Sequence, residues 1–163
     1  MRFPAFPQSL SRLVAKLPPL PASFAFAGAC NLAAWPALRD MDWSAAHGRH
    51  FCVHVRDMGA RVFFFIQADG FHADYRREAD VTFTATAQDF ARLALRLEDP
   101  DTLFFNRRLM IEGDTDLGLR VKNMLDGMEL DDLGRGLPFP LRRGLAMLRE
   151  RLQRELAASS TLR

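Results

Sequence analysis

The chain has 163 residues, of which 48% are hydrophobic. This length and composition are typical of one globular domain with a real core and a terminal extension. Its 22 basic and 20 acidic residues give a net charge of +2, which argues against nucleic-acid binding, because that depends on neutralising phosphates. Fourteen phenylalanines against one tyrosine and two tryptophans favour a Phe-rich core or a lipid-lined cavity over a hydrogen-bonding pocket.

Two helices are predicted near the N-terminus. Leucine and valine at helical spacing predict a short basic amphipathic helix at residues 9–17, which either docks on the domain or contacts a membrane surface. Pro18 and Pro19 end it. The second helix, residues 21–34, is apolar almost all round and ends before Pro36. Such a helix must be buried on more than one side, which leaves a homodimer open.

Four strands follow, because the hydrophobic period changes to two. Residues 50–56 alternate cleanly between apolar and polar, whereas residues 61–67 are apolar on both faces and predict a central strand. Two further strands are predicted at residues 71–75 and 81–85. The intervening turns are too short for parallel crossovers, so these four strands are expected to form an antiparallel meander.

Helices and one more strand complete the predicted domain. Thr86 is expected to cap a helix, residues 103–107 to form an apolar turn and residues 109–112 to form a fifth strand. Asp114 then caps an amphipathic helix. Antiparallel strands with segregated helices predict an α+β fold: a five-stranded, mostly antiparallel sheet covered by helices.

The C-terminal part predicts a linker rich in glycine and proline before a basic amphipathic helix at residues 141–156. The expected organisation is an N-terminal extension (residues 1–20), a central domain (21–132) and a C-terminal linker and helix (133–163). The two cysteines form no CxxC pair, and the apolar runs are too short to span a bilayer. We therefore expect a cytoplasmic protein, with possible contact to the inner membrane.

The first strand offers a metal site as one alternative. His50, Cys52 and His54 alternate along it, so all three side chains leave the same face. Each step along such a face spreads the ligands by about 6.6 Å, so two neighbours could chelate a metal but three could not easily do so. We expect an outer sheet face here, and no metal or cofactor.

Two charged groups offer further alternatives. Glu112, Asp114 and Asp116 could act as an acid–base set, although a strand end and a helix cap are the simpler interpretation. Arg107 and Arg108 could hold a phosphate or carboxylate head group, or could be ordinary surface charges.

The segment from Phe104-Phe105-Asn106-Arg107-Arg108 through Glu112-Gly113-Asp114 to Lys122-Asn123 carries a family resemblance. Over roughly residues 24–130, the chain resembles sterol-carrier-protein-type-2-like lipid-binding domains. Within that superfamily it is most similar to bacterial accessory factors of oxygen-independent ubiquinone biosynthesis. The resemblance implies an apolar tunnel between sheet and helices. It also implies a non-enzymatic role, in which the protein binds prenylated quinone precursors or other lipids and presents them to the ubiquinone enzymes.

The predicted lipid cavity draws apolar side chains from strands and helices. Its candidates are Phe51, Val53, Val55, Phe64, Ile66, Phe83, Phe104, Leu109, Ile111, Leu125 and Met128. Two alternative functions stay open. One is a general phospholipid or acyl-lipid carrier, and the other is a small enzyme or metal site using His50 and His54, or Glu112 and Asp114.

Overall fold

A computed structural model describes residues 19–127 and 136–160 of the chain. The helix predicted at residues 9–17 and the cavity candidate Met128 therefore lie outside the described residues. The elements are α2 (Pro19–Ala33), α3 (Trp35–Leu38), β1 (His50–Val55), β2 (Ala60–Gln67), β3 (Gly70–Ala73), β4 (Val81–Ala85), α4 (Ala87–Ala94), α5 (Pro100–Phe105), β5 (Met110–Gly113), α6 (Thr115–Asp126) and α7 (Phe139–Ser160).

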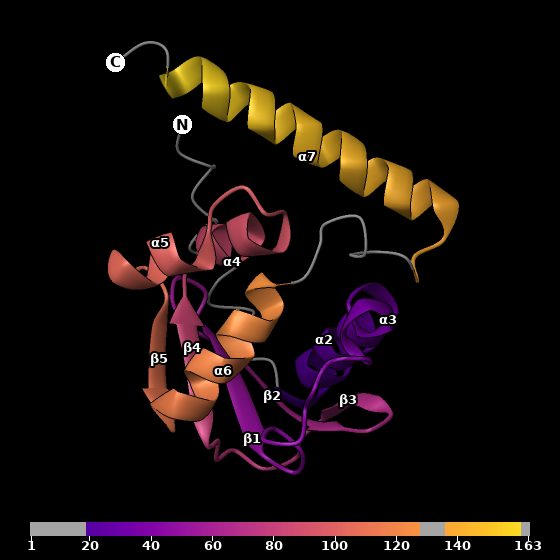
Figure 1. Cartoon of the computed structure of the whole chain (residues 1–163), viewed down its shortest axis with the longest axis vertical. Helices are drawn as coiled ribbons and strands as arrows, with labels where there is room; N and C mark the ends of the chain where they lie inside the picture. The colour runs from indigo at the N-terminus through magenta and orange to yellow at the C-terminus, as the bar shows by residue number, and fades with distance from the viewer. Residues whose placement is uncertain (1–18, 128–135, 161–163) are drawn as a thin grey trace.

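The five strands form one sheet in the order β3-β2-β1-β4-β5, which confirms the predicted α+β fold with a mostly antiparallel sheet. In Figure 1, α6 crosses in front of the central strands, α2 and α3 lie beside β2 and β3, and α4 and α5 lie at one end of the sheet. The helix α7 runs apart from the sheet, beyond α4 and α5.

The prediction of a four-stranded meander was wrong at its last strand. β4 does not pair with β3 but lies parallel to β1, with Val53 opposite Phe83. The rule that parallel neighbours need a long crossover still holds. The crossover from β1 to β4 consists of the whole β2–β3 hairpin and residues 74–80, so the length of any single turn does not limit it.

Prolines begin two short helices where the sequence indicated breaks. The predicted turn at residues 103–107 is largely the helix α5, whose first turn contains Pro100 and whose cap is Asp99, accepting from the Thr102 backbone N–H. Pro36 likewise lies in the first turn of α3 rather than marking only the end of α2. Proline is favourable there because backbone N–H groups in the first turn of a helix have no carbonyl partner within the helix. The N–H group that proline lacks is therefore not needed.

The helix α2 covers the outer edge of the sheet through side-chain amide and hydroxyl groups. The Asn31 side chain accepts from the Phe71 backbone N–H (2.8 Å) and donates to the Phe71 carbonyl (2.7 Å). Ser23 Oγ accepts from the Phe63 N–H at 2.9 Å. The Asn31 bonds satisfy backbone groups of the edge strand β3 that would otherwise be open to another strand, and Ser23 satisfies a backbone N–H of the neighbouring β2. Gly70 permits this approach, because a Cβ there would meet Asn31 Oδ1 at 2.4 Å.

The helix α6 packs tightly on β4 and β5. Asp114 caps it by accepting from the Leu117 N–H at 3.1 Å, as the sequence predicted. A Cβ at Gly118 would lie 2.3 Å from Ile111 Cγ2 and 3.1 Å from Val81 Cγ1, so the missing side chain lets helix and sheet approach closely. The core consists of a large cluster under α2, α3 and α6 and a smaller one of Ala85, Leu103 and Leu109 under α4 and α5.

Candidate functional site

The sheet face that carries the helices is incompletely covered at its centre. Along β1, Phe51 is fully buried, but Val53 and Val55, which point to the same face, are only half-buried. Along β4, Phe83 is half-buried between the fully buried Val81 and Ala85. Central strands under a helix layer are normally sealed, so these three side chains mark an opening in that layer. We call Val53, Val55 and Phe83 the apolar floor.

Half-buried apolar side chains from two helices pack against the same core clusters as the floor residues Val53 and Phe83. Phe90 and Leu93 of α4 pack against the small core cluster, and Met124 of α6 packs against the large one. Phe83 packs against both clusters and so lies where they meet. The arrangement offers an apolar surface with flexible walls, because Met and Leu side chains can change rotamer to fit a long hydrocarbon.

The predicted cavity residues divide into three groups. Phe51, Phe64, Ile66 and Leu109 are buried in the core, and Phe51 and Phe64 stack with ring centroids 5.4 Å apart. Partly buried positions are Val53, Val55, Phe83, Phe104 and Ile111, whereas Leu125 is exposed. The structure therefore brings the strand residues onto one face, but a lipid-binding role for the set stays a prediction.

Charged residues border two surface pockets in the described part of the chain. One, of about 240 Å³, lies near the C-terminal end of α6 and is lined in part by Arg96, Glu98 and Asp126. The other, of about 260 Å³, lies at the start of α6 beside Arg49 and Asp116. Neither is lined by the apolar floor, so the predicted tunnel is not one of these pockets.

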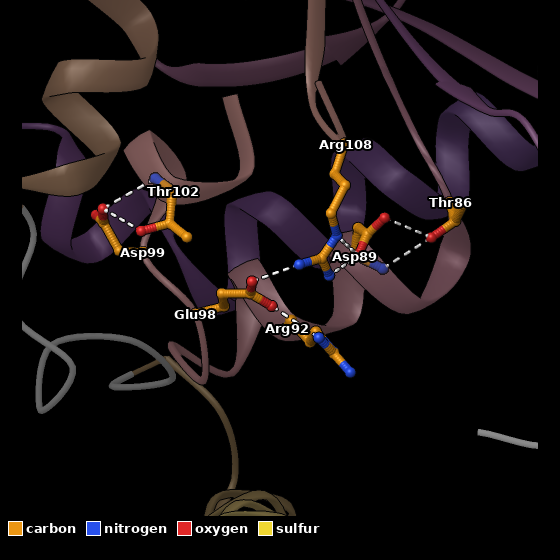
Figure 2. A network of polar contacts seen from close by, with 7 residues as sticks. All are labelled: Thr86, Asp89, Arg92, Glu98, Asp99, Thr102 and Arg108. Carbon is orange, nitrogen blue, oxygen red and sulfur yellow. Dashed lines mark hydrogen bonds and ion pairs between the residues drawn. The ribbon is translucent and has the colours of Figure 1, made fainter. Parts of the chain in front are cut away.

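The guanidinium of Arg108 is held by two carboxylates (Figure 2). It donates to Asp89 Oδ1 from Nε (3.1 Å) and from one terminal nitrogen, and to Glu98 Oε1 from the other. Glu98 also accepts from Arg92 at 2.7 Å. Asp89 is buried, and its second oxygen accepts from Thr86 Oγ1 at 2.8 Å. Arg108 therefore links the loop before β5 to α4. The sequence offered this residue as a candidate for binding a lipid head group, and in the structure it has a structural role.

Electrostatics within this network favour the ionised forms. Burial alone would raise the pKa of Glu98, but hydrogen bonds from Arg108 and Arg92 outweigh it and lower that pKa below the usual value. Burial likewise opposes the charge of Arg108, yet Glu98 and Asp89 raise its pKa overall. The neighbouring Arg107 is exposed, with a φ of 56° that turns the chain at the end of α5. A head-group role for Arg107 and Arg108 stays a prediction.

A second set of charges joins α6 to α4 and α5, and the sequence interpretation missed it. Arg96, just after α4, donates to Asp126 Oδ1 and to the Asp126 carbonyl, both at 3.2 Å, and so caps the end of α6. Lys122 is 5% exposed and pairs with Asp101 of α5. Lys122 is one of only two lysines in the chain, but nothing in its spacing indicated that it would be buried.

The carboxylates of this region also approach one another. Ligand atoms of Asp99, Asp101 and Asp126 lie within 4.8 Å of each other. Lys122 pairs with Asp101 and Arg96 pairs with Asp126, so two of the three charges already have cationic partners. Among the described residues, no other group of three His, Cys, Asp or Glu side chains converges in this way.

The residues of the predicted zinc alternative share a face of β1 but do not converge. His50 Nδ1 lies 2.6 Å from Asp74 Oδ2, and Arg76 lies 3.3 Å from His50 Nε2. Cys52 is buried, and desolvation raises the pKa of its thiol to about 11, so it carries little thiolate near neutral pH. Desolvation, helped by the positive charge of Arg61, lowers the pKa of His54.

The acidic alternative site has structural uses as well. Asp114 caps α6 and pairs with Arg49 at 2.5 Å. Thr84 Oγ1 donates to Glu112 at 3.4 Å across the β4–β5 pair. Asp116 lies exposed in the first turn of α6, where a negative charge favours the helix dipole. These contacts account for all three carboxylates without an acid–base role.

The fold is that of a small α+β domain with a five-stranded sheet under a layer of helices. The model of the SCP-2 sterol transfer family matches residues 34–126, more than half of the chain, and the chain belongs to that family. This confirms the resemblance inferred from the sequence. The helices α2 and α7 lie outside the matched residues.

Particular relatives narrow the comparison. The ubiquinone biosynthesis accessory factor UbiT of Escherichia coli strain K12 is 44% identical over 105 residues, and UbiT of E. coli O157:H7 matches to the same extent. The match covers 64% of this chain and spans 60% of the length of each relative. A solved UbiJ-SCP2 ubiquinone synthesis protein is 19% identical, with 64% of this chain and 93% of that chain covered and a TM-score of 0.50, which shows the shared fold alone.

Proposed function

We propose that this protein is a non-catalytic accessory factor of ubiquinone biosynthesis that binds a prenylated intermediate and presents it to the pathway enzymes. The observation that carries the proposal is the half-buried apolar floor of Val53, Val55 and Phe83 at the centre of the sheet face that carries the helices. Membership of a lipid-transfer family and 44% identity to UbiT support it.

The physical case rests on burial of hydrocarbon. Covering apolar surface yields about 25 cal/mol per Å², so several isoprene units laid on this floor bind without a polar anchor. Met124 and Leu93 pack against the same core clusters as Phe83 and can adjust to a chain of variable shape. In this proposal the ligand rests mainly on the floor, and the four buried candidates remain packed in the core.

The finer features belong to the same proposal. We infer a role in the oxygen-independent branch of the pathway, a cytoplasmic location with contact to the inner membrane, and partners among the ubiquinone enzymes. The described residues contain no helix long and apolar enough to cross a membrane, so a membrane contact by them would be peripheral. No cofactor or metal is invoked.

Lipid binding is tested first with the purified full chain. Extraction and mass spectrometry should find copurified prenylated quinones or their precursors. The double variant Val53→Thr/Val55→Thr keeps side-chain volume but places hydroxyl groups on the floor, and it should bind a prenylated precursor several-fold more weakly. Phe105→Ser, at an exposed aromatic outside the floor, is the matched control and should bind normally. Equal binding by the double variant and the wild type would refute the assignment of the floor.

A general acyl-lipid carrier is the second candidate function, because an uncharged floor does not by itself select prenyl chains. Gene deletion separates the two: quinone levels should fall in cells grown without oxygen and stay normal with oxygen. Unchanged quinone in both conditions would favour the general carrier. Full in-cell activity of His50→Ala and Glu112→Ala would count against the enzymatic alternative.

A further inference from the structure

We infer that the outward face of α2 is the contact surface for a second copy of this chain, packed helix against helix around a two-fold axis. This inference concerns assembly and does not depend on lipid binding. The face belongs to the helix that the sequence analysis found apolar almost all round.

The exposed positions of α2 are all apolar. The inner side of the helix is fixed to the sheet edge by Ser23 and Asn31. Between Pro19 and Ala34 the sequence has no charged residue. The exposed residues of α2 carry no polar side chain and are Pro21, Phe24, Ala25, Gly28, Ala29 and Leu32. An ordinary solvated face would carry charged or polar groups, so this face fits burial against a partner.

The shape of the face suits two helices that cross at an angle, close together at the middle of the row and diverging toward its ends. Phe24, Gly28 and Leu32 follow at intervals of four residues and therefore lie in one row. Large side chains occupy the two ends of the row, where Phe24 is 54% and Leu32 is 45% exposed. At the centre, a Cβ on Gly28 would have no heavy atom within 4 Å. The row is therefore high at its ends and low in its middle.

An antiparallel pair of α2 helices uses this shape. With the two-fold axis at Gly28, Phe24 of one copy lies opposite Leu32 of the other, and the two glycines meet in the middle. Small residues at the crossing point let the helix axes approach closely, and the same patch serves both copies. Tyr75, which is 70% exposed and contacts Phe24 edge-on with ring centroids 6.0 Å apart, extends the apolar surface.

Charge favours a second copy over an anionic membrane as the occupant. Helices that lie on membrane surfaces combine an apolar face with lysine or arginine. The helix α2 has the apolar face but contains no lysine or arginine. The guanidinium of Arg76, next to Tyr75, lies 3.3 Å from His50 Nε2. Two uncharged faces approach each other without like-charge repulsion. Because one helix pair buries less than the roughly 1,200 Å² of a standard stable interface, we expect a weak dimer that dissociates on dilution.

Sedimentation velocity over a wide range of protein concentration tests the inference on the full chain. The wild type should shift from monomer to dimer as concentration rises. Gly28→Leu should weaken self-association by about ten-fold or more, because a side chain at the crossing point keeps the helices apart. The same substitution should not unfold the monomer, because the Cβ position is free and leucine favours a helix over glycine.

Two controls separate this interface from general effects. Gly144→Leu makes the same change in α7, where a Cβ also has no neighbour within 4 Å, and it should leave self-association unchanged. Phe24→Lys and Leu32→Glu should each dimerise poorly alone. A mixture of these two variants should associate, because the antiparallel arrangement places the introduced ammonium group of one copy opposite the introduced carboxylate of the other.

Flotation with vesicles of phosphatidylethanolamine and phosphatidylglycerol gives the competing outcome. A wild-type chain that stays monomeric at every concentration would overturn the inference. If that monomer floats with vesicles and Gly28→Leu or Phe24→Lys abolishes flotation, the face binds lipid instead. Association that Gly28→Leu leaves intact would equally overturn the role of α2.

Discussion

Replacing Arg108 with methionine should reveal whether this residue serves the fold or a ligand. The substitution keeps much of the side-chain length but removes the hydrogen bonds to Asp89 and Glu98. Asp89 is buried and would keep only its bonds with Thr86. Breaking a buried ion pair costs about 3–5 kcal/mol. Since a third of the Arg108 side chain is exposed, we expect a loss of about 2–4 kcal/mol in unfolding free energy.

Urea denaturation followed by circular dichroism measures this loss. With a slope of about 2 kcal/mol per molar urea, the midpoint should fall by about 1–2 M. Arg107→Met, at the exposed neighbouring position, should change the unfolding free energy by no more than about 0.5 kcal/mol. Adding Asp89→Asn to Arg108→Met should restore part of the stability, because the uncompensated buried charge is then gone.

An Arg108→Met variant that unfolds at the wild-type urea concentration would contradict the structural role of this residue. A normal midpoint together with weaker binding of anionic lipids would identify Arg108 as a head-group residue after all. Lipid affinity must be compared at a temperature where each variant is fully folded, so that lost stability is not mistaken for lost binding.

Three further predictions concern packing, the sheet edge and pH. Gly118→Ala should destabilise the protein by about 1–2 kcal/mol in thermal unfolding, because overpacking against Ile111 exceeds the gain of about 1 kcal/mol in helix propensity; a higher melting temperature would contradict this close approach. Asn31→Ala should cost about 1–3 kcal/mol in urea unfolding by leaving the Phe71 backbone groups without their partner, and an unchanged midpoint would show that water replaces the amide. The lowered pKa of Glu98 stabilises the fold above its usual pKa of 4.5, so this contribution should be lost as pH falls below that value through the folded-state pKa; Glu98→Gln should show a shallower acid-side decline, and an identical decline would refute the linkage.

Local patterns predicted most of the fold, because each element carries its own periodicity. The alternation through Phe51, Val53 and Val55 indicated both a strand and its inward face, and the register of β1 with β2 and β4 agrees with that face. The cap at Asp114 could be predicted because an acidic residue just before an amphipathic segment commonly caps the N-terminus of a helix. The position of β4 beside β1 could not be predicted, because strand order depends on contacts between residues that are far apart in the sequence.

The candidate site was less predictable than the fold. A period of two shows which side chains face the helices but not how completely the helices cover them, so Phe51 and Val53 looked equivalent although only Val53 lies at the opening. Arg108 looked like its neighbour Arg107, and only the three-dimensional approach of Asp89 and Glu98 distinguishes them. Burial and ion pairing between distant segments are properties of the assembled fold.

The parallel pairing of β1 with β4 also bears on the order of folding. The segment that contains α2, β1, β2 and β3 is continuous in sequence, and its strand pairs are local. β4 can complete the sheet only by joining β1 across the intervening residues 56–80, and such non-local pairing is slow. During synthesis, the edge of β1 that pairs with β4 therefore stays unpaired until β4 and the helices after it have emerged. We expect this intermediate, rather than the finished sheet, to be the species that aggregates when folding is perturbed.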